Sequence, residues 1–165
     1  MTNDLVALAA AYGVATEFWD QAGAHQVVSE QTVVAVLAAL GVDATTPASI
    51  AAALSERRMR DWRRTLPPVF VVREGDAATC WVHLPHGDGA RLRVELEDGG
   101  SRSDVSQVDR WVEPQDVDGA LVGEAAFALP TDLPTGWHRL HAELSSQDGT
   151  TSFASTTLVV TPRRV

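Results

Sequence analysis

The sequence predicts an α+β fold: a small N-terminal helical subdomain of about three helices, followed by an immunoglobulin-like antiparallel β-sandwich of about seven strands. Two observations predict this class. Over residues 1–66 apolar residues recur at the spacing of amphipathic helices, whereas from residue 67 onward they alternate with polar residues, as in half-buried strands. We therefore expect two domains, a helical subdomain at 1–66 and a β-sandwich at 67–165.

The first two helices have local start and stop signals. Leu5 and Leu8 lie on one face of the first helix, and Gly13 is placed to end it. Ser29 is a suitable N-cap for the second helix because its hydroxyl can accept a hydrogen bond from a free backbone N–H. Gly41 is placed to end that helix.

The third helix begins at Thr46-Pro47, where the proline occupies the first helical position and its missing N–H costs nothing. It ends before Pro67-Pro68, because the residue before each proline is pushed out of the α region. Period-two alternation and intervening Gly- and Asp-containing turns then predict strands at 69–72, 80–84, 92–97, 104–112, 122–129, 137–145 and 151–161.

Composition and charge restrict the partners. The formal net charge is −9, so the chain repels phosphate backbones and anionic lipid surfaces, and we expect no nucleic-acid partner and no membrane partner. Cys80 is the single cysteine and forms no internal disulfide. The N-terminus resembles no signal peptide, and no apolar stretch is long enough to span a membrane. We expect a cytoplasmic location.

Residues typical of catalysis or metal binding do not gather in a recognisable motif. The five histidines have no spacing that converges on one metal, so we expect them to be solvated or locally hydrogen-bonded. Glu95 and Glu97 share a strand face, as paired glycosidase carboxylates might, but they alternate with arginines on an exposed face. We expect no catalytic residue, no metal ligand and no cofactor in this chain.

A cluster of arginines lies toward the end of the third helix. It consists of Arg57, Arg58, Arg60, Arg63 and Arg64. Cations in the last turns complement the helix dipole, and their aliphatic stems cover apolar surface. The alternative is a docking face for an acidic surface of a neighbouring domain, so these five residues are candidate docking cations.

Tryptophans are the candidates for ligand or interdomain contact. The four candidates are Trp62, Trp81, Trp111 and Trp137. Trp81 falls on the outward side of its strand, and Trp137 does so unless a bulge after Gly136 turns it inward. An exposed indole offers a flat face for a sugar ring or an anchor for another protein surface. Packing between domains and burial in the core remain open alternatives.

Two ordered series of motifs resemble a known family. The first is YGV (12–14), FWD (18–20), VSEQTV (28–33) and LAALGV (37–42), and the second is WRRTLPPV (62–69), LPTGWHRL (133–140) and LVVTP (158–162). In this order they are similar to the N-terminal region of bacterial 4-alpha-glucanotransferases, or amylomaltases, especially the larger actinobacterial type. The resemblance covers essentially the whole chain, and Trp137 stands where such sequences often have tyrosine.

The resemblance implies a function for a longer protein. Family members transfer α-1,4-linked glucan segments with retention, using carboxyl groups of a (β/α)₈ barrel that follows this region. The chain is too short to hold that barrel, so we expect a non-catalytic accessory or scaffold region whose partner is the missing barrel of the same polypeptide. The parent enzyme is a candidate homodimer.

Two other functions stay open. One is a carbohydrate-binding module that holds α-glucan on Trp81 or Trp137. The other is a free-standing protein-interaction module that uses an exposed sheet edge. The scaffold hypothesis predicts an exposed apolar patch that includes Trp62, Trp81 or Trp111.

Overall fold

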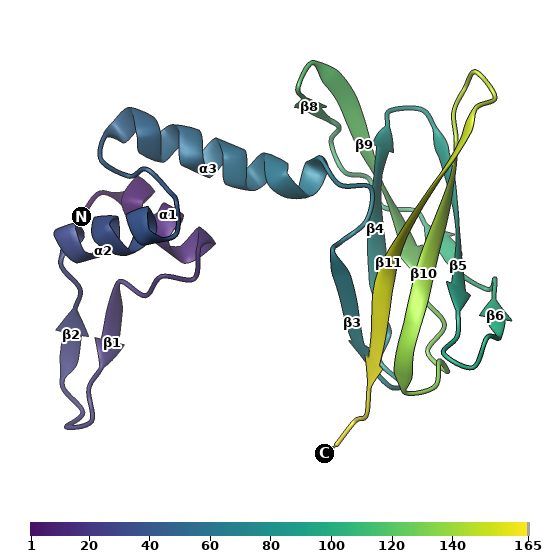
Figure 1. The fold of residues 1–165 in the computed structure, drawn as a ribbon, viewed down its shortest axis with the longest axis horizontal. Helices are drawn as coiled ribbons and strands as arrows, with labels where there is room; N and C mark the ends of the chain where they lie inside the picture. Colours follow the sequence, from purple (N-terminus) through teal and green to yellow (C-terminus); the bar gives the residue numbers. More distant parts are fainter. Residues whose placement is uncertain (165) are drawn as a thin grey trace. The chain divides into compact units, whose positions relative to one another are not determined.

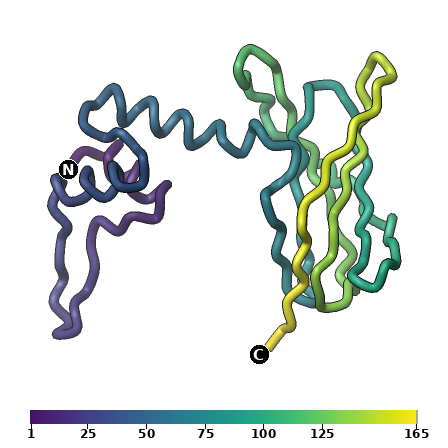
Figure 2. The backbone as a smooth tube through the Cα atoms, viewed as in Figure 1, coloured from purple at the N-terminus to yellow at the C-terminus, as the bar shows by residue number. Residues whose placement is uncertain are grey.

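The computed structural model describes residues 1–164 and places them in two compact units, Met1–Arg60 and a second that begins at Asp61. Figure 1 shows the elements of each unit, most of them labelled, and Figure 2 traces the backbone path. The expected domain limits, 1–66 and 67–165, stay a prediction.

The first unit is helical and contains one small hairpin. Its elements are α1 (Asn3–Ala11), β1 (Glu17–Trp19), β2 (His25–Val27), α2 (Glu30–Ala39) and most of α3 (Pro47–Trp62). The expected caps form: Ser29 Oγ accepts from Thr32 N at 3.1 Å, and Thr46 Oγ1 accepts from Ser49 N at 3.1 Å. Gly41 adopts φ 78° beyond α2, as a helix-ending glycine does.

The core of this unit is formed by one face of each helix. Leu8 and Val33 are completely buried, together with Leu37, and Ile50 of α3 packs against them. The antiparallel β1–β2 hairpin was not expected from the sequence. Its strands are only three residues long and all six residues are exposed, so they carry no buried period-two pattern.

The second unit is a two-sheet sandwich. The larger sheet has the order β3 (Val69–Arg73), β11 (Thr151–Thr161), β10 (Gly136–Ser145), β5 (Gly89–Glu95) and β6 (Ser101–Arg102). The smaller sheet has the order β4 (Thr79–Pro85), β9 (Ala120–Ala128) and β7 (Ser106–Val108), and β8 (Gln115–Val117) also pairs with β9. Inward residues of both sheets, including Val82, Val94, Leu140 and Leu158, are fully buried in one core.

Several details differ from the expected sandwich, and strands β6 and β8 were not expected from the sequence. One pair, β3–β11, is parallel, whereas the other strand pairs of the described residues are antiparallel. The strand expected at 104–112 is also shortened, because only Ser106–Val108 pair with β9. Asp109 and Arg110 beyond it are exposed, and the following Pro114 cannot donate to a ladder.

Candidate functional site

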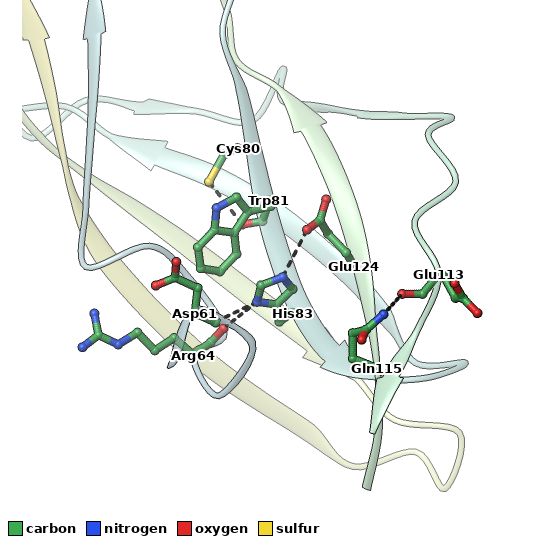
Figure 3. A network of polar contacts seen from close by, with 8 residues as sticks. All are labelled: Asp61, Arg64, Cys80, Trp81, His83, Glu113, Gln115 and Glu124. Carbon is green, nitrogen blue, oxygen red and sulfur yellow. Dashed lines mark hydrogen bonds and ion pairs between the residues drawn. The ribbon is translucent and has the colours of Figure 1, made fainter. Parts of the chain in front are cut away.

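A buried histidine joins the last turn of α3 to strand β4. His83 Nδ1 lies 2.9 Å from the carbonyl oxygen of Asp61 and 3.2 Å from that of Arg64. These carbonyls accept from Nδ1, and the Asp61 carbonyl also accepts from the backbone N–H of Arg64 at 3.0 Å, so both are satisfied at the end of the helix. Nε2 lies 3.2 Å from Glu124 Oε2 on β9, directly across the ladder. Figure 3 shows these three contacts around the ring.

Two tryptophans cover the same histidine ring. The Trp62 and Trp81 rings lie 4.3 Å and 4.2 Å from it, tilted by 13° and 22°. Two rings stacked at these separations cannot share one side, so they cover opposite faces. His83 is consequently buried although its parity points outward from the sandwich. This arrangement is a packed structural junction and exposes no reactive group.

The cysteine beside this junction is inert. Cys80 is completely buried, and burial raises the pKa of its thiol to about 12. Its Sγ donates to the carbonyl oxygen of Trp81 at 3.4 Å (Figure 3). A thiol in this state is a small apolar side chain and not a nucleophile.

The two glutamates do not form a pair of catalytic carboxyl groups. Glu95 Oε2 lies 2.8 Å from His141 Nε2 on β10. Glu97 lies beyond the end of β5, and its Oε2 accepts from the backbone N–H of Trp137 at 3.0 Å. His138 Nδ1 accepts from the N–H of Glu97, and Nε2 donates to the carbonyl of Pro134 at 2.7 Å. Both glutamates therefore fix local backbone and side-chain geometry.

The candidate docking cations have different environments. Arg57 donates from Nε to the carbonyl of Ala11 at 3.1 Å. Arg63 forms a two-point contact with Asp118, at 2.8 Å and 3.0 Å, and holds the pKa of that carboxyl below its usual range. Arg58, Arg60 and Arg64 are exposed. Docking by any of the five stays a prediction.

The tryptophans also divide into two groups. Trp62 and Trp81 are half-buried against His83, whereas Trp111 and Trp137 are 79% and 67% exposed. Trp19 on the β1–β2 hairpin is 71% exposed and was not among the candidates from the sequence. The FWD motif before the Gly23 turn was a signal for that exposed hairpin tip.

An apolar row crosses the outer face of the larger sheet at Trp137. The register places Val159 of β11 between Trp137 of β10 and Val71 of β3. Val71 is 58% exposed, and Val69, one row away, is also exposed. We call Val69, Val71, Val159 and Trp137 the outer-face row. Within residues 61–164 no other element covers the exposed side chains of Val69, Val71 and Trp137.

Neither a metal cluster nor a membrane span was found in the part of the chain that the structure describes. No three or more His, Cys, Asp or Glu side chains of residues 1–164 gather in a way that would hold a metal ion. Over the same residues, no helix is long and apolar enough to cross a membrane.

Comparisons with known proteins agree on one family. Residues 65–162 match the family model described as the MalQ N-terminal beta sandwich domain. The chain is 46% identical over 162 residues to the 4-alpha-glucanotransferases of Mycobacterium bovis and Mycobacterium tuberculosis, covering 98% of this chain but 22% of each relative. The crystal structure of amylomaltase from Corynebacterium glutamicum matches with a TM-score of 0.86 and 42% identity, over 98% of this chain and 23% of that one. The chain thus spans about a fifth of the length of these relatives.

Proposed function

Because the chain belongs to the MalQ N-terminal beta sandwich domain family, we propose that it is the accessory N-terminal region of a longer 4-alpha-glucanotransferase. In that role it does no chemistry and supports a catalytic barrel in the same polypeptide. The relatives that bear the name 4-alpha-glucanotransferase support the proposal, because the matched region is only 22% of their length. By family resemblance, the parent enzyme transfers α-1,4-glucan segments with retention.

The outer-face row is the observation that supports the docking role. Two exposed valines, the half-buried Val159 and an exposed tryptophan lie on three neighbouring strands, which is costly in water and typical of a surface that another body covers. Val159 lies only two residues before Thr161, the last residue of β11. Polypeptide that follows β11 in a longer protein therefore starts beside the row, at a high effective concentration.

A chimera tests the proposal. This chain replaces the aligned 162 residues of the Mycobacterium tuberculosis relative, and glucan transfer and thermal unfolding are measured. We expect transfer by the chimera and none by the isolated chain. Val71→Ser with Trp137→Ser should lower the unfolding temperature of the chimera while leaving the isolated chain unchanged. The matched control is Phe153→Ser, which is 76% exposed on the same strand as Val159.

The results separate the parts of the proposal. Transfer by the isolated chain would overturn the accessory role. If Phe153→Ser lowered the unfolding temperature of the chimera as much as the double variant Val71→Ser with Trp137→Ser, the outer-face row would not be the docking surface.

A second candidate function is direct contact with α-glucan at Trp137. Its indole is 67% exposed and has Glu97 and Arg139 as polar neighbours, which suits one sugar ring. Phe153 is the next aromatic on this face, six positions along β11 from Val159 and so about 20 Å away. Titration of maltoheptaose tests it: saturable fluorescence changes that vanish in Trp137→Ala would support the contact, and silence would exclude it.

A further inference from the structure

Most of strand β5 has an unpaired edge. On one side, β10 pairs with β5 from Gly89 to Glu95. On the other side, β6 pairs only with Val94 and Glu95. Figure 1 shows β6 beside only the end of β5. The first five residues of the strand, 89–93, therefore have an open edge, which is a template for another strand.

The backbone groups along this edge can be assigned from the neighbouring turn. Leu96 donates its N–H to the carbonyl of Gly100 at 2.8 Å, on the β6 side. Because backbone groups alternate in direction along a strand, Val94, Leu92 and Ala90 point their N–H and C=O groups to the same side. The groups of Ala90 and Leu92 thus face the open edge.

A hollow of about 650 Å³ borders the same edge and extends over β10 and β11. Its apolar lining includes Leu92, Val105 and Phe127, and Ser103 and Gln107 line it toward β7. Leu92 and Phe127 belong to the sandwich core, so a side chain that entered this space would contact the core directly. An added strand would point alternate side chains into the hollow, because successive side chains point to opposite faces.

The outward side chains of residues 89–93 are cationic. Arg91 and Arg93 are exposed and alternate with inward Ala90 and Leu92. On the β10 side, Arg91 lies opposite Glu143 and Arg93 lies opposite His141. Arg93 Nη1 also lies 3.8 Å from Glu95 Oε2. Opposite charges on directly paired residues stabilise neighbouring strands. On the unpaired edge of β5, Arg91 and Arg93 therefore favour an incoming strand that carries carboxylates at alternate positions.

We propose that the open edge of β5 binds an extended segment of a separate partner protein by strand addition, and that this segment alternates acidic with aliphatic residues. Its backbone pairs with Ala90 and Leu92, its aliphatic side chains enter the hollow, and its carboxylates lie beside Arg91 and Arg93. This interaction is independent of the accessory function proposed above.

Two other occupants are disfavoured. A second copy that paired through the same edge would place its own Arg91 and Arg93 against these arginines, and like charges directly opposite are destabilising. Polypeptide that follows β11 leaves the sheet at the wrong end. Gly89 lies opposite Ser145, which lies opposite Thr151, and Thr161 is ten positions later, about 33 Å along the strand.

The experiment uses the isotope-labelled full chain and two synthetic peptides. The probe is acetyl-GEVEVEG-amide, and the control is acetyl-GKVKVKG-amide. We expect saturable NMR shift changes at residues 89–93 and at Val105 and Phe127, with slower amide exchange at Ala90 and Leu92. The lysine peptide should bind at least tenfold more weakly. The absence of NMR shift changes with either peptide up to about 1 mM would overturn the proposal.

Variants test the mode of binding. Ala90→Pro removes one edge N–H and leaves the ladder to β10, so it should abolish the shifts. If that variant fails to fold, the double variant Arg91→Glu with Arg93→Glu tests the charge instead and should reverse the peptide preference. Arg73→Glu on β3, at the opposite edge of the sheet, is the matched control. Unchanged binding in the β5 variants, or equal binding of both peptides, would overturn the proposal.

Discussion

His83 and Glu124 lie directly opposite each other on β4 and β9, with Nε2 3.2 Å from Oε2. The other ring nitrogen faces two carbonyl oxygens, which only accept, so Nδ1 carries a hydrogen. One nitrogen therefore holds the end of α3, the other holds β9, and two indoles fix the plane of the ring. A single side chain thus joins the last turn of α3 to strands β4 and β9 of the smaller sheet.

The first prediction concerns this junction. His83→Ala removes the side-chain donor to the carbonyls of Asp61 and Arg64 and opens a cavity between two indoles. We expect a loss of about 3 kcal/mol in the free energy of unfolding. Urea denaturation followed by tryptophan fluorescence measures it. The control is His86→Ala at an exposed histidine, which should change stability by less than about 0.5 kcal/mol. Equal effects of the two variants would contradict the structural role.

The second prediction concerns the carboxyl of Asp118. The Arg63 guanidinium lowers its pKa in the folded state, so the pair contributes stability above the pKa of the unfolded chain. That contribution is lost as pH falls through the lower, folded value. Carbon-detected NMR titration should show Asp118 titrating at a lower pH than in Arg63→Gln. An unchanged titration in the variant would contradict it. Asp148, whose low pKa arises from contacts with Thr150, is the control.

The third prediction is that Cys80 is silent toward thiol reagents in the native state. Burial raises the pKa of the thiol to about 12, so the reactive thiolate is absent at neutral pH. We expect no reaction with a chromogenic disulfide reagent at about pH 8, and a full equivalent of reaction in urea. Rapid reaction of the native chain would show that the β4 core position is open to solvent.

The fourth prediction concerns the start of β10. Gly136 adopts φ 149°, and an added Cβ would press on Glu97 Oε2 and lie 3.3 Å from His138 Cε1. Gly136→Ala should therefore displace the carboxylate from the Trp137 N–H and cost about 1–3 kcal/mol. Denaturation and the Trp137 amide shift measure this. Gly89→Ala, which meets only Ser145 O at 3.9 Å, is the control and should cost less.

Local signals predicted the fold best. Ser29, Thr46 and Gly41 act through contacts within three residues, so the helix limits could be inferred from the sequence alone. The β1–β2 hairpin has no buried face, so it carries no period-two pattern of apolar residues. The parallel β3–β11 pair joins segments far apart in the chain, so it depends on tertiary contacts and leaves no local pattern.

The candidate site was harder to predict for a related reason. Strand parity correctly placed Trp81 on the outward side of β4, and it placed His83 there too. Parity says which way a side chain points, but it does not say what packs on it. The end of α3 brings Trp62 over His83, and that placement makes an outward histidine a buried one.

The pairing of β3 with β11 has a consequence for synthesis of the protein. Val69 pairs with Thr157, which lies 157 − 69 = 88 positions later. Strand β3, the first of the sandwich, therefore cannot pair until β11, the last, has been synthesised. Pairings of such long sequence separation form slowly. On the ribosome, the larger sheet cannot be completed until β11 has emerged, and until then β10 keeps one edge unpaired. A nascent chain therefore passes through a stage in which chaperone binding or misassociation competes with closure of the sheet.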